Sequence, residues 1–168
     1  MLCEHRPPSH SGPADPRYVT RSADEYTGTF LFENNIVADN GKNGINFDGT
    51  PGGGAIMRFN TLYFNGAFDS IQADHIGPNK VSGIAAKHVG FMTIANNIIV
   101  CRNDSYSALS VWDASPTTTN GNLILNCAVN LRTPAVGTVT MDPKFVAPST
   151  DLGVADFSLS PGLILKGA

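Results

Sequence analysis

Apolar residues along the chain fall into short runs of three to five, separated by Asn, Gly, Asp and Ser. The runs are rich in Ile, Val, Phe and Leu, which is typical of β-strands that end in turns. None of them reaches the roughly ten residues that an amphipathic helix would need. The pattern therefore predicts an all-β chain of short strands.

One arrangement of these runs recurs. It appears first in residues 33–49, where an apolar strand, an Asn-Gly corner and a second apolar strand follow one another. The first strand of each repeat is preceded by Asn35, Asn60, Asn97 or Asn122, with spacings of 25, 37 and 25 residues. The second strand holds Ile45, Ile71 or Leu109, with spacings of 26 and 38. We call these two sets of residues anchors. The spacing of both sets increases at the same repeat, so we predict an insertion in that repeat, placed at residues 72–90.

A short repeat without helical periodicity predicts a β-solenoid, in which each coil supplies one strand to each of two or three parallel sheets. Asparagine suits the corners because it tolerates the left-handed conformation, and its amide can bond an asparagine one coil away. We therefore predict a hydrogen-bonded ladder through the four repeat asparagines. The alternative fold is a β-sandwich, whose irregular turns would not require both sets of anchors to share an insertion.

The remaining sequence divides around these coils. Residues 1–26 hold four prolines among Ser, His, Arg and Asp, which predicts an irregular N-terminal arm. Residues 27–141 contain the coils, and residues 50–54, with the sequence TPGGG, are predicted to form a flexible loop within them. The division thus leaves residues 142–168 as a separate closing segment.

That closing segment carries a family resemblance. Residues 142–162, DPKFVAPSTDLGVADFSLSPG, resemble the end of right-handed parallel β-helix proteins of the pectin-lyase-like superfamily. In that family a D-P-x-F-V element and a D-F-x-L-x-P-G element follow the last coil and lie across its end. The resemblance implies an all-β, right-handed parallel β-helix of about four to five coils with 142–168 as its C-terminal capping segment. The chain departs from the family after Gly162, where LILKGA replaces the usual Ser-Pro.

Composition excludes two kinds of partner. The net charge is −3, and no cluster of Lys or Arg offers a phosphate-binding surface, so we expect no nucleic-acid partner. No apolar run approaches the roughly 18 residues of a membrane span, so we expect no membrane partner either. The first residues lack the apolar core of a secretory signal, although the composition resembles that of exported β-helix proteins. The location is therefore open between the cytoplasm and an exported, processed chain.

Three cysteines show no metal-binding spacing. Cys101 and Cys127 are 26 residues apart, about one coil, which places them on neighbouring turns. We predict that they stack as small core side chains, with a disulfide as the alternative. Cys3 falls in the N-terminal arm.

Enzymes of the superfamily mostly act on acidic polysaccharides, and the resemblance implies two kinds of site. Lyases hold Ca²⁺ on carboxylates and use an Arg or Lys base, whereas hydrolases use clustered Asp residues. The hydrolase pattern is absent, because Asn60-Thr61 is followed by Leu62 and no Asp-Asp pair occurs. A lyase-like site with Ca²⁺ as cofactor is the remaining catalytic hypothesis.

The candidate catalytic residues for that hypothesis are Asp48, Asp74, His75, Lys87 and His88. Asp48 and Asp74 each follow a second-strand anchor by three residues and could therefore stack on one face. An imidazole can transfer protons near neutral pH, although turn aspartates and surface histidines are the commoner roles. The candidate substrate-binding residues are Arg58, Tyr63 and Trp112. For Trp112, a partly buried position at the edge of the core is the alternative.

Two functions follow from these observations. The first is a carbohydrate-recognising module, a reduced relative of polysaccharide lyases with a polysaccharide as partner. The second is a non-catalytic fragment of an exported β-helix protein that associates with itself. The missing signatures favour a chain without catalysis; an enzyme here would be lyase-like. An uncapped solenoid end exposes apolar core and unpaired backbone, so we also predict a homodimer through the N-terminal end, with coverage by the N-terminal arm or by a lost upstream portion as the alternatives.

Overall fold

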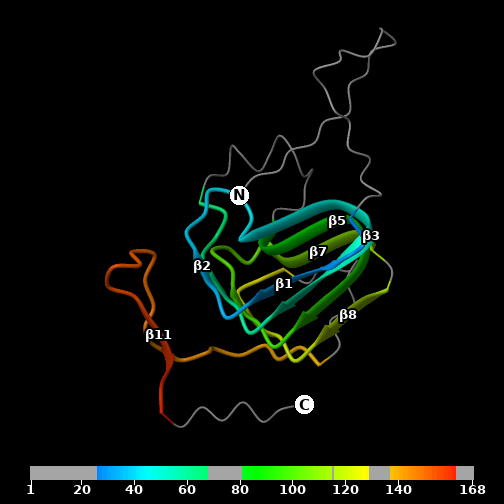
Figure 1. Cartoon of the computed structure of the whole chain (residues 1–168). Helices are drawn as coiled ribbons and strands as arrows, with labels where there is room; N and C mark the ends of the chain where they lie inside the picture. The colour runs from blue at the N-terminus through cyan, green and yellow to red at the C-terminus, as the bar shows by residue number, and fades with distance from the viewer. Residues whose placement is uncertain (1–25, 68–80, 115, 129–136, 162–168) are drawn as a thin grey trace, which may run out of the picture.

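The structure is a computed structural model that describes residues 26–67, 81–114, 116–128 and 137–161 (Figure 1). These ranges contain strands and no helix, which confirms the all-β prediction. The strands are β1 (Thr29–Glu33), β2 (Ile36–Ala38), β3 (Ile45–Arg58), β4 (Thr61–Tyr63), β5 (Val81–Ala95), β6 (Ile98–Val100), β7 (Ser107–Ala114), β8 (Thr117–Asn120), β9 (Leu123–Leu125), β10 (Phe145–Ala147) and β11 (Asp156–Leu159).

The chain alternates between two parallel sheets. The larger sheet has the order β1-β3-β5-β7, with β8 also paired to β5, and the smaller sheet has the order β2-β4-β6-β9. From β1 to β7, strands that follow each other in the sequence lie in different sheets, stacked against counterparts from the next repeat; β8 then follows β7 in the larger sheet before β9 continues the smaller one (Figure 1). Parallel sheets built by such alternation are compatible with a β-helix.

Strands β3 and β5 are longer than the sequence pattern predicted, with 14 and 15 residues. The TPGGG segment was expected to be a flexible loop, but it lies inside β3, where the register with β5 shifts between Thr50 and Gly54. A Cβ on Gly54 would lie 2.2 Å from Phe91 Cδ1, so this position requires glycine. The glycines thus keep the chain in the sheet through an irregular stretch instead of releasing it as a loop.

The pairing of β5 with β3 and β7 shows that one residue of the predicted second set of anchors is wrong. Ile84, not Ile71, pairs with Ile45 on one side and with Leu109 on the other. Residues 81–90 belong to β5, so the residues that lengthen this repeat lie upstream of Val81 and not across 72–90. The prediction failed because an isolated apolar residue at the expected spacing is not distinguishable from the true partner thirteen positions later.

The predicted asparagine ladder is confirmed. The Oδ1 atoms of Asn60, Asn97 and Asn122 each accept the backbone N–H and the Nδ2–H of the preceding ladder asparagine, at 3.0–3.1 Å. These three side chains are buried. The residue before each ladder position has a positive φ, at Asn34, Phe59, Asn96 and Gly121. Each ladder asparagine thus closes a tight left-handed turn between the larger and the smaller sheet.

The core lies between the two sheets. Met57, Ile84 and Ile94 come from the larger sheet, and Leu62 and Ile99 come from the smaller one; all five are essentially inaccessible to solvent. Apolar residues from strands far apart in the sequence therefore stabilise the same layer through hydrophobic burial.

The closing segment forms an antiparallel pair, β10 and β11, to one side of the sheets (Figure 1). Phe157 and Phe145 pack edge-on against Tyr63 of β4, with ring centroids 5.2 and 6.3 Å from the Tyr63 centroid. The Lys144 ammonium and backbone N–H donate hydrogen bonds to Asp142, which hold the pKa of that carboxyl below its usual range. β4 is an interior strand of the smaller sheet, so the β10–β11 pair packs against an interior strand and not against the last strand, β9.

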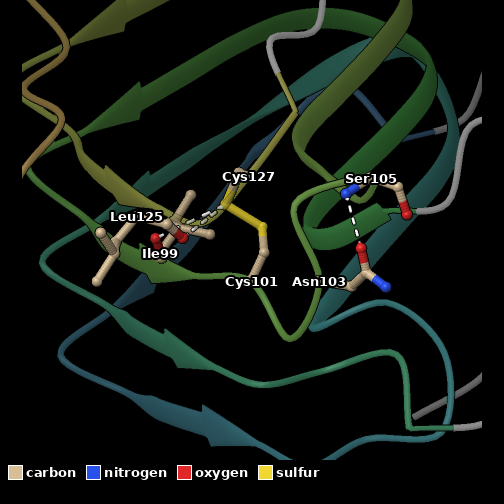
Figure 2. Close-up of a disulfide and its surroundings, with 6 residues drawn as sticks. All are labelled: Ile99, Cys101, Asn103, Ser105, Leu125 and Cys127. Atoms are coloured by element: carbon tan, nitrogen blue, oxygen red, sulfur yellow. Dashed lines mark hydrogen bonds between the residues drawn. A yellow bond between two sulfur atoms is a disulfide. The ribbon is translucent and has the colours of Figure 1, made fainter.

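The structure contains a disulfide between Cys101 and Cys127, so the predicted stacking of free thiols is wrong (Figure 2). The two Cα atoms are 5.1 Å apart, within disulfide reach, because both cysteines come just after the paired strands β6 and β9, whose last register pair is Val100 and Leu125. Cys127 Sγ also lies 3.2 Å from the Leu125 carbonyl oxygen. A disulfide sulfur carries no proton, so we treat this as a contact and not as a hydrogen bond.

Candidate functional site

Three of the candidate positions occupy one row of the larger sheet. Lys87 of β5 pairs with Asp48 of β3 on one side and with Trp112 of β7 on the other. Register partners in neighbouring parallel strands are separated by only about 5 Å. We had expected Asp74 beside Asp48, and the register places Lys87 there instead.

The Trp112 indole is held against its own strand. Its Nε1–H donates a hydrogen bond of 2.7 Å to the Oγ of Ser110, which lies two residues earlier on the same face of β7. Ser110 is buried, and its register partner Ala85 is buried as well. The half-buried indole therefore has a fixed orientation above small residues, while the neighbouring Lys87 is exposed.

His88 is exposed beside Lys87 because the strand is irregular there. Successive side chains of a regular strand point to opposite faces. Here Ala86 and Val89 are both in the core, and the two residues between them both face solvent. His88 achieves this with a φ of 53°, in the left-handed region. The result is a lysine and a histidine that are adjacent in the chain and both accessible.

Asp74 and His75 lie outside the described residues. Within the described ranges, no group of three or more His, Cys, Asp or Glu side chains could hold a metal ion. The residue next to Asp48 in the sheet is a lysine, which is a poor neighbour for a cation. The described residues thus do not fit the Ca²⁺ that the family resemblance implies, and we derive no chemistry through it.

Arg58 is not brought to the Lys87 row. It is the last residue of β3, beyond the irregular stretch that separates it from Asp48. Its Nε donates to Glu33 Oε2 at 2.6 Å, and its guanidinium carbon lies 5.7 Å from the centroid of the Phe59 ring. The side chain thus links two strands of the larger sheet, β1 and β3.

Tyr63 lies on the smaller sheet and is only 9% exposed. Its ring stacks on Phe64 with a centroid distance of 4.1 Å, in addition to its contacts with the closing segment. Burial raises the pKa of the phenol, and the nearby charge of Arg102 lowers it in part. The ring faces are therefore occupied by protein and are not offered to a ligand.

The hydrogen bonds of Arg102 are the main interactions that the sequence did not predict. Its Nε and Nη2 donate to the Phe64 carbonyl oxygen at 3.1 and 2.8 Å, and its Nη2 also donates to Asp39. Asp39 and Phe64 are equivalent residues of successive repeats, each with a positive φ. Arg102 follows Asn97 by five residues, as Asn65 follows Asn60, so the two residues occupy equivalent positions of their repeats. This spacing was the signal in the sequence that pointed to Arg102.

Alkaline pH is expected to weaken the packing of the closing segment on Tyr63. A raised pKa means that the folded state favours the neutral phenol, so this contribution is present below the unfolded value near 10 and is lost as pH rises through the folded value. Above about pH 10, urea unfolding should show a steeper loss of stability in the wild type than in Tyr63→Phe. Tyr26→Phe, at an exposed position, is the control and should leave the wild-type pH dependence unchanged.

The described part of the chain contains no helix that is long and apolar enough to cross a membrane. Comparisons with protein-family models, curated proteins and solved structures found no match to the chain. The functional conclusion therefore depends on the residues and the geometry described above.

Proposed function

We propose that the chain is a carbohydrate-recognising module built as a right-handed parallel β-helix, a reduced relative of polysaccharide lyases. Three features support this architecture: the alternation between two parallel sheets, the asparagine ladder, and the resemblance of residues 142–162 to the closing segment of the pectin-lyase-like superfamily. Handedness and coil number, about four to five, are part of the proposal.

The row of Asp48, Lys87 and Trp112 is the observation that carries the binding function. An indole with a fixed orientation supplies a flat apolar surface for the C–H face of a sugar ring. An exposed ammonium beside it can bind a carboxylate. Together these groups favour an acidic polysaccharide over a neutral one.

Recognition without catalysis is the form of the proposal that the chemistry supports. A lyase would need a base and a group that neutralises the substrate carboxylate at the same point. Of the five candidate catalytic residues, Asp48, Lys87 and His88 lie within the same stretch of the larger sheet, and the described residues hold no metal-binding group. The sheet row provides contacts for a sugar chain but no complete acid–base arrangement.

Tryptophan fluorescence can test the proposed binding, because Trp112 is the only tryptophan of the chain. Titration with oligogalacturonate, alginate or chondroitin fragments should change its emission in a saturable way. Lys87→Ala should weaken binding of the acidic fragments about fivefold to tenfold, because it removes a charge-assisted contact.

Lys42→Ala is the matched control, because it removes the same charge from the corner between β2 and β3. It should bind like the wild type. The proposal is wrong if none of the acidic fragments changes Trp112 emission, or if both lysine variants bind equally well. Appearance of unsaturated uronate during incubation would instead assign a lyase activity to the chain.

A further inference from the structure

Within the described ranges, the first acceptor of the asparagine ladder, at its N-terminal end, receives no hydrogen bond. Asn60, Asn97 and Asn122 each receive two hydrogen bonds on Oδ1 from the preceding ladder asparagine. Asn35 is the first member, and no described residue donates to its Oδ1. Besides its bond to Asn60, the Nδ2 of Asn35 donates to the Glu33 carbonyl oxygen of its own turn, at 2.8 Å.

The backbone of β1 is open on the same side. Gly54 N–H donates to the Gly28 carbonyl oxygen, and Asn34 N–H donates to the Arg58 carbonyl oxygen. In a parallel pair the residues that bond the neighbouring strand alternate with residues that face away. The even-numbered residues of β1 therefore bond β3, and the peptide groups of Thr29 and Leu31 face the free edge of the sheet.

Apolar side chains are exposed at this edge. Phe30 is 43% exposed, although its register partner Ala55 is fully buried, so Phe30 is a core-facing residue with no described strand over it. Its ring lies 5.3 Å from that of Phe47 and 6.5 Å from that of Phe32, centroid to centroid. Leu31, on the opposite face of β1, is 49% exposed. A core and a strand edge that no described residue covers lie at one place, and such a combination marks an interaction surface.

The opposite end of the smaller sheet differs. Val139 pairs in parallel with Leu123 of β9, its N–H donates to the Asn122 carbonyl oxygen, and its carbonyl oxygen accepts from Ile124 N–H. The outer edge of β9 is thus already paired. A two-fold contact through β1 uses the same edge of the larger sheet twice and needs no second, complementary end.

We propose that a second copy of this chain pairs with the free edge of β1, antiparallel and centred on Leu31. In that register the free peptide groups of Leu31 bond their counterparts, and those of Thr29 bond Glu33. Phe30 of one copy lies opposite Phe32 of the other, which extends the aromatic core across the interface. Glu33 lies opposite Thr29, so no like charges meet.

This pairing goes beyond carbohydrate binding and uses a different part of the larger sheet. Asp48, Lys87 and Trp112 lie on the other side of the irregular stretch of β3 from Gly54, where β1 begins to pair. A variant that separates the two copies should therefore keep its response to acidic oligosaccharides. Failure of one proposal leaves the other unaffected.

Sedimentation equilibrium of the full chain tests the pairing. The wild type should approach twice the chain mass of 17.7 kDa as concentration increases. Leu31→Lys places two ammonium groups opposite each other and should weaken the dimer at least about tenfold. Leu31→Pro offers an independent variant, because it removes an N–H for which no described residue is an acceptor.

Val154→Lys is the matched control, since it introduces the same charge at a more exposed apolar residue of the closing segment. It should sediment like the wild type, and all variants should retain the wild-type far-ultraviolet circular dichroism. A wild type that stays monomeric at every concentration overturns the proposal. So does a folded Leu31→Lys variant that dimerises as strongly as Val154→Lys.

Discussion

Replacing Asn97 by alanine is expected to lower the free energy of unfolding by about 3–5 kcal/mol. The Asn97 side chain is 1% exposed and makes four hydrogen bonds of 3.0 Å. Its Oδ1 accepts twice from Asn60, and its Nδ2 donates to the carbonyl oxygen of Met57 and to Asn122 Oδ1. Alanine would leave several of these partners buried and unsatisfied, each at a cost of about 1–3 kcal/mol.

Urea unfolding followed by circular dichroism measures this effect, and the ladder supplies its own control. Asn35 is the terminal member and is only half-buried, with a single ladder neighbour. Asn35→Ala should therefore cost less than half as much as Asn97→Ala. Equal losses at the two positions would contradict the view that the buried interior of the ladder determines its contribution.

Reduction of the Cys101–Cys127 disulfide is expected to lower stability by about 3 kcal/mol. The bond closes a loop with a sequence separation of 26, and opening it restores conformational freedom to the unfolded chain. Cys101 is fully buried, so the reductant should act slowly on the folded protein.

Thermal melting with and without dithiothreitol measures this contribution. The double variant Cys101→Ser/Cys127→Ser should melt near the temperature of the reduced wild type and should show no further response to the reductant. Cys3→Ser is the control and should retain the full response. A wild type whose melting temperature is insensitive to complete reduction would contradict the predicted contribution.

The ladder was predictable from sequence because its signal is chemical as well as periodic. Asn60 and Asn97 are buried polar residues, and a buried amide must find partners. An asparagine before an apolar run at a regular spacing therefore specifies both the turn and the bonds that close it. The parallel β-architecture followed from the same regularity.

The register of β5 could not be predicted in the same way. Ile71 and Ile84 are chemically alike, and only the pairing with Ile45 and Leu109 distinguishes them. The continuity of β3 depends on the close approach of Gly54 to Phe91, a contact between distant residues. Tertiary contacts of this kind leave no local trace in a single sequence.

The candidate site was predictable by residue type but not by arrangement. Lys87 was selected as a candidate catalytic residue and Trp112 because its ring suits sugar binding, and the sheet register makes them neighbours. Tyr63 was selected for the same reason, yet its ring lies under the closing segment. Aromatic chemistry alone does not tell whether a ring will be covered by protein or exposed to a ligand.

The ladder closes with the same hydrogen-bond distances across very different lengths of chain. Asn35 and Asn60 are 25 residues apart and Asn60 and Asn97 are 37 apart, yet both backbone bonds measure 3.0 Å. The sheets thus keep the same register although the chain between Ala67 and Val81 makes one repeat longer than the others. A further change of length between Ala67 and Val81 should therefore leave the hydrogen bonds of the ladder unchanged.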